Sequence, residues 1–191
     1  MKTAGLPLET DRLIVRRYEE RDVADILDYS RHAPSDEHRR RNVDWELSKK
    51  GVASWWEPMK TMEVDEAKSW LGLLIEVKDL GRVVGNTGFN VKKVGGHRQG
   101  MIGWIIGEAF EGNGYMTEAV TALLNYLFLT EEFHRTYAMT SPDNTRSWRL
   151  MERLGMRREA HFIKNCYHDD GWTDEYVYAI LASEWRERRE R

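Results

Sequence analysis

The sequence lacks three features that would place it in well-known protein classes. Among its 191 residues Cys166 is the only cysteine, which excludes an internal disulfide and a zinc site built from several cysteines. No stretch approaches the roughly eighteen apolar residues of a membrane span, and the first residues show no signal-peptide pattern. We therefore expect a soluble, cytoplasmic protein with no metal and no membrane partner.

An excess of charge of one sign is also missing. The chain has 29 basic and 32 acidic side chains, for a formal net charge of −3, so the totals suggest neither a nucleic-acid partner nor an acidic tail. The length suits one domain with a real core, and no repeat or low-complexity segment appears. We expect a single domain over residues 1–191, a monomer or homodimer whose partner is small or locally charged.

The first part of the chain mixes strand and helix patterns. Residues 13–18 combine branched apolar side chains with arginines and predict a strand. Residues 19–29 have apolar side chains at near-helical spacing and predict a helix from about residue 20. Periodicity fades between residues 32 and 62, a stretch rich in charge and tryptophan. The segment VDEAKSWLGLL at residues 64–74 predicts a second, shorter helix.

The remaining chain alternates strands and helices. Residues 73–107 predict three antiparallel strands separated by Asp-Leu-Gly and Gly-Gly-His turns. The further elements are a long helix with an apolar stripe from Val120 to Phe128, a strand at 135–140, a helix between an Asn144 N-cap and a Gly155 stop, and strands at 158–168 and 173–181. The charged end from residue 185 is predicted to be solvated. Mixed strand and helix order predicts an α+β or mixed α/β sheet.

The segment EGNGYMTEAV at residues 111–120 places two glycines just before the long predicted helix. A helix N-terminus supplies unpaired N–H groups and about half a positive charge, and glycines let a phosphate approach closely. Neither the spacing nor a lysine fits a Walker loop, and Thr117 stands where a dinucleotide fingerprint requires glycine or alanine. The pair alone predicts either another kind of phosphate site or a tight turn.

Four separated blocks carry a family resemblance. GRVVGNTGF, MIGWIIGEAFEGNGYMTEAVTALLNYLF, EFHRTYAMTSPDNTRSWRLMERLGMRREA and GWTDEYVYAILASEW resemble, in order and spacing, the RimJ/RimL-type branch of the GNAT N-acetyltransferase superfamily. The resemblance covers most of the chain and leaves residues 32–62 unmatched. It implies an α+β fold with a GNAT-like central, mostly antiparallel twisted sheet flanked by helices. It also implies acetyl transfer from acetyl-CoA directly to a primary amine.

The resemblance also implies the positions of the acetyl-CoA site. The loop from Glu111 corresponds to the family's pyrophosphate loop, and Glu111 and Met116 depart from its usual residues. The implied cofactor-binding residues are Trp104, Ile105 and Ile106, which offer backbone groups to the pantetheine arm, the loop residues Gly112, Asn113, Gly114, Tyr115, Met116 and Thr117, and Asn144. Ser147 is the implied catalytic residue, a proton donor to the departing thiolate. A weak acid suffices, because a thiol with a pKa of about 8.5 leaves readily.

The general base and the acceptor stay open. Cys166 stands where some relatives have a carboxylate, and Met101 stands where this branch often has glutamate. The remaining candidate bases are His97, His168, Asp169, Asp170 and Asp174. The acceptor amine is a peptide N-terminus, a polyamine, an amino sugar or a small antibiotic amine. The alternative function is a catalytically idle, CoA-binding or regulatory protein of the same fold, and a nucleotide-binding reductase is a distant third.

Overall fold

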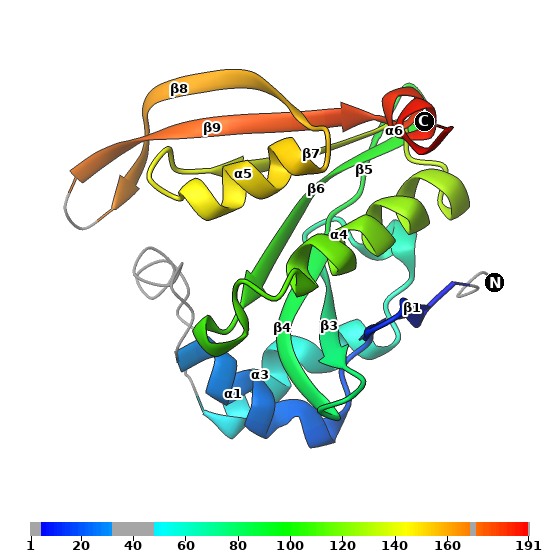
Figure 1. Cartoon of the computed structure of the whole chain (residues 1–191), viewed down its shortest axis with the longest axis vertical. Helices are drawn as coiled ribbons and strands as arrows, with labels where there is room; N and C mark the ends of the chain where they lie inside the picture. Colours follow the sequence, from blue (N-terminus) through cyan, green and yellow to red (C-terminus); the bar gives the residue numbers. More distant parts are fainter. Residues whose placement is uncertain (1–4, 32–47, 169–170, 191) are drawn as a thin grey trace.

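The computed structural model describes residues 5–31, 48–168 and 171–190 (Figure 1). In these ranges one sheet of nine strands has the order β1-β2-β3-β4-β6-β7-β9-β8, with β5 paired to β6. The strands are β1 Leu8–Glu9, β2 Leu13–Arg16, β3 Leu71–Val77, β4 Arg82–Phe89, β5 Lys92–Val94, β6 His97–Ile106, β7 Arg135–Thr140, β8 Arg157–His168 and β9 Gly171–Leu181. All pairs are antiparallel except β6 with β7. The predicted fold class, mixed α/β with a mostly antiparallel sheet, is confirmed.

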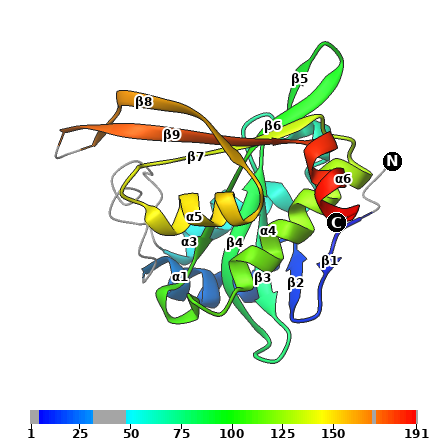
Figure 2. The ribbon, with the colours of Figure 1, turned by 45° about the horizontal axis from the view of Figure 1, so that its top comes forward.

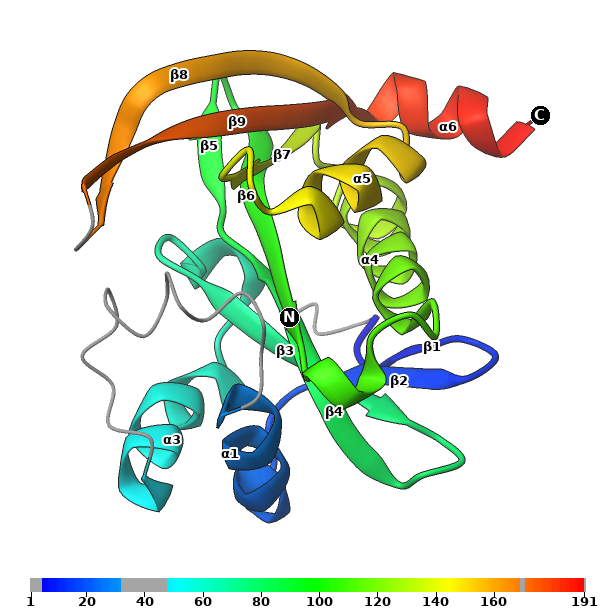
Figure 3. The same cartoon turned by 60° about the vertical axis from the view of Figure 1, so that its left-hand side comes forward.

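Helices cover both faces of this sheet. The α-helices are α1 Val23–Arg31, α3 Lys49–Trp56, α4 Tyr115–Asn125, α5 Thr145–Arg153 and α6 Ala182–Glu190, and a π-helical turn, Tyr126–Thr130, extends α4. Short 3-10 helices occupy Glu20–Asp22, Glu57–Lys60, Val64–Glu66 and Glu108–Phe110. Figure 3 shows α1 and α3 on one side of β3, β4 and β6, with α4 and α5 on the other. None of the helices in the described ranges combines the length and apolar character that a bilayer crossing requires.

The helix predicted at residues 64–74 is wrong. Only Val64–Glu66 forms a 3-10 turn, and the chain enters β3 at Leu71. Every residue of β3 is buried, because helices cover both faces of this inner strand. A strand buried on both faces has a continuous apolar sequence, which periodicity cannot distinguish from a helix.

Two further predictions differ from the structure. Residues 73–107 contain the short strand β5 together with all of β4 and β6 and part of β3, so the count of three strands is wrong. At the charged C-terminal end, residues 186–190 are exposed as predicted, but they belong to the helix α6. Trp185 of this helix is buried and donates its indole N–H to Asn125 at 3.0 Å.

The stretch in which periodicity fades, residues 32–62, contains α3 and the turn Glu57–Lys60 among its described residues. Its residues 32–47 lie outside the described ranges.

Candidate functional site

The parallel strands β6 and β7 diverge in the middle of the sheet (Figure 2). They pair only from Gln99 with Arg135 to Met101 with Tyr137, although β6 continues to Ile106 and β7 to Thr140. Beyond this point no strand in the described ranges pairs with the β7-facing edge of β6. The divergence therefore leaves backbone hydrogen-bonding groups exposed in the centre of the molecule.

Alternation along β6 shows which residues present those groups. The Arg98 carbonyl accepts from the His134 amide at 2.8 Å on the β7 side, whereas the Met101 carbonyl accepts from the Asn90 amide at 3.0 Å on the other side. Because peptide groups alternate along a strand, the even-numbered Trp104 and Ile106 turn their N–H and C=O groups toward the opening. The Ile105 carbonyl instead lies so close to β4 that a Cβ on Gly85 would collide with it.

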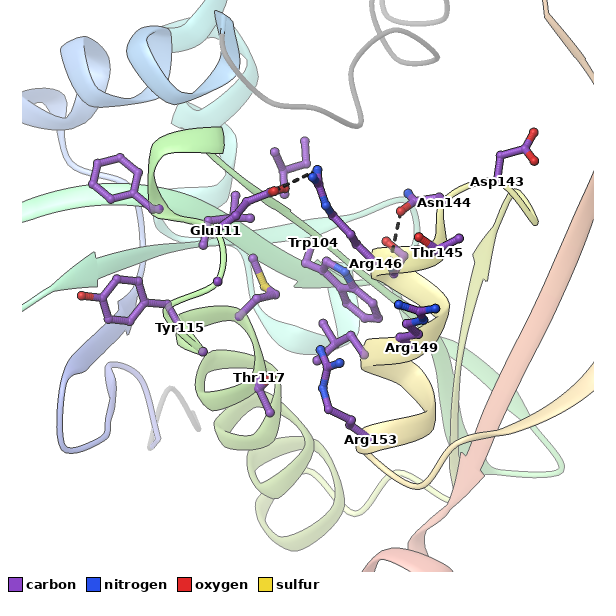
Figure 4. A pocket seen from close by; sticks show the side chains of 18 residues that line it. Trp104, Glu111, Tyr115, Thr117, Asp143, Asn144, Thr145, Arg146, Arg149 and Arg153 are labelled. Carbon is purple, nitrogen blue, oxygen red and sulfur yellow. Dashed lines mark hydrogen bonds and ion pairs between the residues drawn. The ribbon is translucent and has the colours of Figure 1, made fainter.

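A cleft of about 920 Å³ begins at this opening (Figure 4). It brings together β6, the glycine loop and the first turns of α4 and α5. The predicted site residues that line it are Trp104, Ile105, Ile106, Gly112, Gly114, Tyr115, Met116, Thr117, Asn144 and Ser147. Asn113 is not among them, because its side-chain amide turns back to the carbonyls of Phe110 and Glu111 at 3.1 and 3.2 Å.

The glycine loop ends in an open helix N-terminus. Gly112 and Gly114 have φ angles of +77° and +78°, a left-handed conformation in which glycine carries no steric penalty. Gly114 is the N-cap of α4 and makes no side-chain cap. In the part of the chain that the structure describes, no acceptor satisfies the amides of Tyr115, Met116 and Thr117. Three free N–H groups at the positive end of a helix dipole form an anion-binding site.

Arg12 holds this loop in place from the turn between β1 and β2. Its guanidinium donates to Glu118 in the first turn of α4 at 2.7 Å and to the Asn113 carbonyl at 3.0 Å. It also lies over the ring of Tyr115, 4.9 Å from the centroid. Partial burial acts to raise the pKa of Glu118, but hydrogen bonds from Thr10 and Arg12 hold it below its usual value. The carboxylate therefore stays charged and anchors the loop.

Three arginines of α5 line the cleft, and the sequence analysis missed them. Arg146, Arg149 and Arg153 are three and four residues apart, so they share one helical face. Their row makes this wall of the cleft cationic, which suits a ligand with several phosphates. This spacing, just after the matched Asn-x-x-Ser, is the sequence signal that could have revealed them.

Asn144 and Ser147 lie at the start of α5. Asn144 is the N-cap as predicted, since its side-chain oxygen accepts from the Ser147 amide at 3.2 Å. Ser147 is half-buried, and its hydroxyl has no hydrogen-bond partner within the described ranges. The hydroxyl is therefore available to a ligand in the cleft.

Glu111 pairs with Arg146 across the cleft from the glycine loop to α5. The two side chains form an ion pair at 2.9 Å, drawn as a dashed line in Figure 4. Burial raises the pKa of Glu111, and Arg146 partly opposes this shift. The carboxylate that departs from the family pattern thus has a cationic partner on the opposite wall.

Replacing Glu111 by glutamine should tighten CoA binding by about threefold, the effect expected of one partly screened charge. The variant frees Arg146 for the ligand and removes a carboxylate from the anion site. Glu111 is charged above its raised pKa and neutral below it, so the affinity gap should be widest near neutral pH and close as the pH falls. Calorimetric titration with CoA measures this. Exposed Glu108→Gln is the control and should bind as the wild type does.

The candidate bases Asp174 and His97, which the structure describes in full, do not line the cleft. Asp174 pairs with His161 at 2.7 Å and accepts from the Lys164 amide at 2.9 Å. His97 lies at the start of β6, with its ring 6.2 Å from that of His134. Asp169 and Asp170 lie outside the described ranges, as does the side chain of His168.

Comparison with known proteins agrees with this architecture. The model of the acetyltransferase (GNAT) domain family matches residues 12–157. The chain therefore belongs to the GNAT family of acetyltransferases. It is an N-acetyltransferase, an enzyme that transfers an acetyl group to an amine, and it is of the RimJ/RimL-like kind.

Individual relatives support the same conclusion. The chain is 30% identical over 178 residues to the uncharacterized N-acetyltransferase YnaD of Bacillus subtilis (strain 168), covering 93% of this chain and 98% of the relative. It is 29% identical to the ribosomal protein uS5-alanine N-acetyltransferase of Escherichia coli (strain K12), covering 93% and 92%. A GNAT acetyltransferase structure from Bacillus anthracis superposes with a TM-score of 0.75 at 29% identity, covering 92% of this chain and 98% of that one.

Proposed function

We propose that the cleft binds acetyl-CoA and that the chain passes the acetyl group directly to a primary amine. The observation that carries this proposal is the convergence of an unsatisfied helix N-terminus, at Tyr115 to Thr117, with an arginine row from another helix. The helix N-terminus suits the pyrophosphate of CoA, and the arginine row adds cationic charge for the third phosphate group of CoA. Neither group alone would select CoA over a simpler phosphate ligand.

The strand β6 supplies the second half of the proposed site. The outward peptide groups of Trp104 and Ile106 would pair with the amide-containing pantetheine arm as an added strand does. Asn144 would contact the same arm from the start of α5. When bound, acetyl-CoA supplies an acetyl group on a thioester. An N–H of β6 would stabilise the negative charge that develops on the carbonyl oxygen during attack.

Direct transfer is favoured over an acetyl-enzyme on Cys166. Burial, followed by the neighbouring carboxylate of Glu175, raises the pKa of the Cys166 thiol. A thiol with a raised pKa stays protonated near neutral pH, and only the thiolate is a good nucleophile. We propose that the acceptor is a protein N-terminus or a small-molecule amine, since a relative of nearly equal length is named for acetylating a ribosomal protein.

Ser147 is proposed as the proton donor to the departing thiolate. Ser147→Ala should lower kcat by about fivefold, a small loss because the thiol is a good leaving group and water can take over. The dissociation constant for CoA should stay within about twofold of the wild type, since the role lies in the chemical step. Thr145→Ala, at the same helix start, is the control and should keep the full rate. A full rate in the Ser147 variant would assign the proton to water.

The function itself is tested by thiol release from acetyl-CoA with a panel of amines. The panel should contain alaninamide, short peptides, a polyamine and an amino sugar, and mass spectrometry should confirm the acetylated product. Thiol release that depends on one class of amine is the expected result. CoA binding without acetylation of any amine would instead support an idle, regulatory member of the fold. The absence of CoA binding would refute the proposal.

A further inference from the structure

In the described part of the chain, no helix covers the sheet face opposite α5 over the strands β7, β9 and β8. On the α5 side Tyr178 is buried, and its hydroxyl donates to Glu152 of that helix at 3.0 Å. On the opposite face the side chains of Met139 and Phe162 are 37% and 46% exposed. Figure 3 shows that α1 and α3 lie away from this part of the sheet. A molecule could therefore reach β7 from this side while another occupies the cleft on the α5 side.

Strand register places Glu175 on the open face. Met139 pairs with Val177, and residues paired across two strands share a face, as do residues two apart on one strand. Val177 and Glu175 therefore lie on the same face as Met139, and Glu175 pairs in turn with Phe162. Its neighbour Tyr176 pairs with Thr140, the last residue of β7. Glu175 thus lies beside the turn that leads from β7 to Asn144 and Ser147.

The carboxylate of Glu175 is held by neutral groups. It accepts a hydrogen bond from the Asn165 side-chain amide at 2.6 Å, and the thiol of Cys166 lies nearby, where the Glu175 carboxylate helps to raise its pKa. Within the described ranges no lysine, arginine or histidine lies at ion-pair distance from it, and its side chain is half-buried. On the same two strands Asp174 has His161 as a partner, and Glu159 has Arg135 and Arg157. Among the residues that the structure describes, Glu175 is therefore a positioned carboxylate with no cationic partner.

Asn165 holds the Glu175 carboxylate in place. Its side-chain amide nitrogen lies 2.6 Å from a carboxylate oxygen of Glu175 and 3.9 Å from the sulfur of Cys166. A neutral amide donor fixes the orientation of the carboxylate without neutralising its charge.

We propose that Glu175 binds the ammonium group of the acceptor and removes its first proton before attack. The inference rests on the proposed acetyl transfer and adds to it the group that recognises the amine. An ammonium ion supplies the missing cation for a half-buried carboxylate. The flanking side chains of Met139, Val177 and Phe162 are apolar, so the matching acceptor is a single primary ammonium group attached to an apolar body. A peptide N-terminus with a neutral side chain has this chemistry.

The proton balance of the reaction is complete with these groups. The acceptor arrives as an ammonium ion and gives one proton to the Glu175 carboxylate, which later releases it to solvent. The neutral amine forms a bond to the acetyl carbon, and the bond from that carbon to sulfur breaks. The nitrogen loses its second proton as the amide forms, and the thiolate gains one from Ser147, which is reprotonated in exchange. The products are the acetylated amine, the CoA thiol and one free proton.

The test is the variant Glu175→Gln, which keeps the shape of the side chain and one acceptor oxygen for Asn165. We expect the KM for alaninamide to rise by at least tenfold, while the dissociation constant for CoA stays unchanged. The pH profile should change as well, because the variant must take its substrate as free amine. Its kcat/KM should recover toward the wild-type value as the pH rises through the amine's own pKa, near 8. A purely structural role would not produce this recovery.

Glu159→Gln is the control, since it removes the same charge from an exposed glutamate of the paired strand β8. It should leave the KM for alaninamide unchanged. Calorimetric titration of the CoA complex with alaninamide gives a second measurement that needs no turnover, and the Glu175→Gln variant should bind at least tenfold more weakly. An unchanged KM and affinity in a folded Glu175→Gln variant, or an equal loss in Glu159→Gln, would overturn the inference while leaving acetyl transfer intact. Failure of the wild type to bind CoA would refute the proposed function instead.

Discussion

Replacing Gly114 by valine should weaken CoA binding by at least tenfold, or about 1.4 kcal/mol. Gly114 is the N-cap of α4 with φ +78° and ψ 0°, a left-handed conformation that a β-branched residue adopts only at a considerable energetic cost. Valine would shift the loop and cover the amides of Tyr115 and Met116 with a branched side chain. Calorimetric titration with CoA measures the loss directly.

Gly81→Val controls for backbone strain in this experiment. Gly81 has φ +58° in the turn between β3 and β4, and nothing lies within 4 Å of a Cβ placed there. This variant should lose a similar amount of stability, about 1–2 kcal/mol, and bind CoA as the wild type does. Equal CoA affinity in folded Gly114→Val and wild-type protein would show that the loop is a simple turn.

Replacing Arg16 by methionine should lower the free energy of unfolding by about 3–5 kcal/mol, the usual result of removing one partner from a buried ionic group. The guanidinium of Arg16 donates to Asp22 at 2.7 and 2.8 Å and to Glu76 at 2.7 Å. All three side chains are buried. Methionine fills much of the same space but leaves the buried Asp22 carboxylate without its arginine and Glu76 with only the exposed Arg21. Chemical denaturation monitored by tryptophan fluorescence measures the change.

The control for this variant is Arg21→Met. Arg21 also contacts Glu76, at 3.3 Å, but its side chain is 60% exposed, so the loss should be less than about 1 kcal/mol. Similar losses in the two variants would mean that burial does not determine the strength of this network. The network joins β2 and β3 to the entry of α1, so its loss should also loosen the N-terminal half of the sheet.

Most elements of the C-terminal half could be predicted because their signals are local. Asn144 before α5 and Gly155 after it, with φ +84°, are end signals that act within a few residues. The strand at 135–140 was predicted with its observed bounds. In contrast, the first residues of β3, Leu71–Leu74, were assigned to a helix, because a strand buried on both faces has a continuous apolar sequence. The burial of Trp185 was not predicted either, because it depends on a contact between α6 and the core that the charged sequence around it does not indicate.

Spacing along the chain is enough to predict the family resemblance, the glycine loop before α4 and most residues that line the cleft, because these features depend on helix ends and left-handed glycines. The pairing of charges follows from the folded arrangement instead. Arg12 reaches Glu118 across 106 residues, Glu111 pairs with Arg146 on the opposite wall, and Glu175 lies beside Cys166 through strand pairing. Such contacts arise from sheet register and helix packing, which bring distant residues together and leave no periodic trace in the sequence.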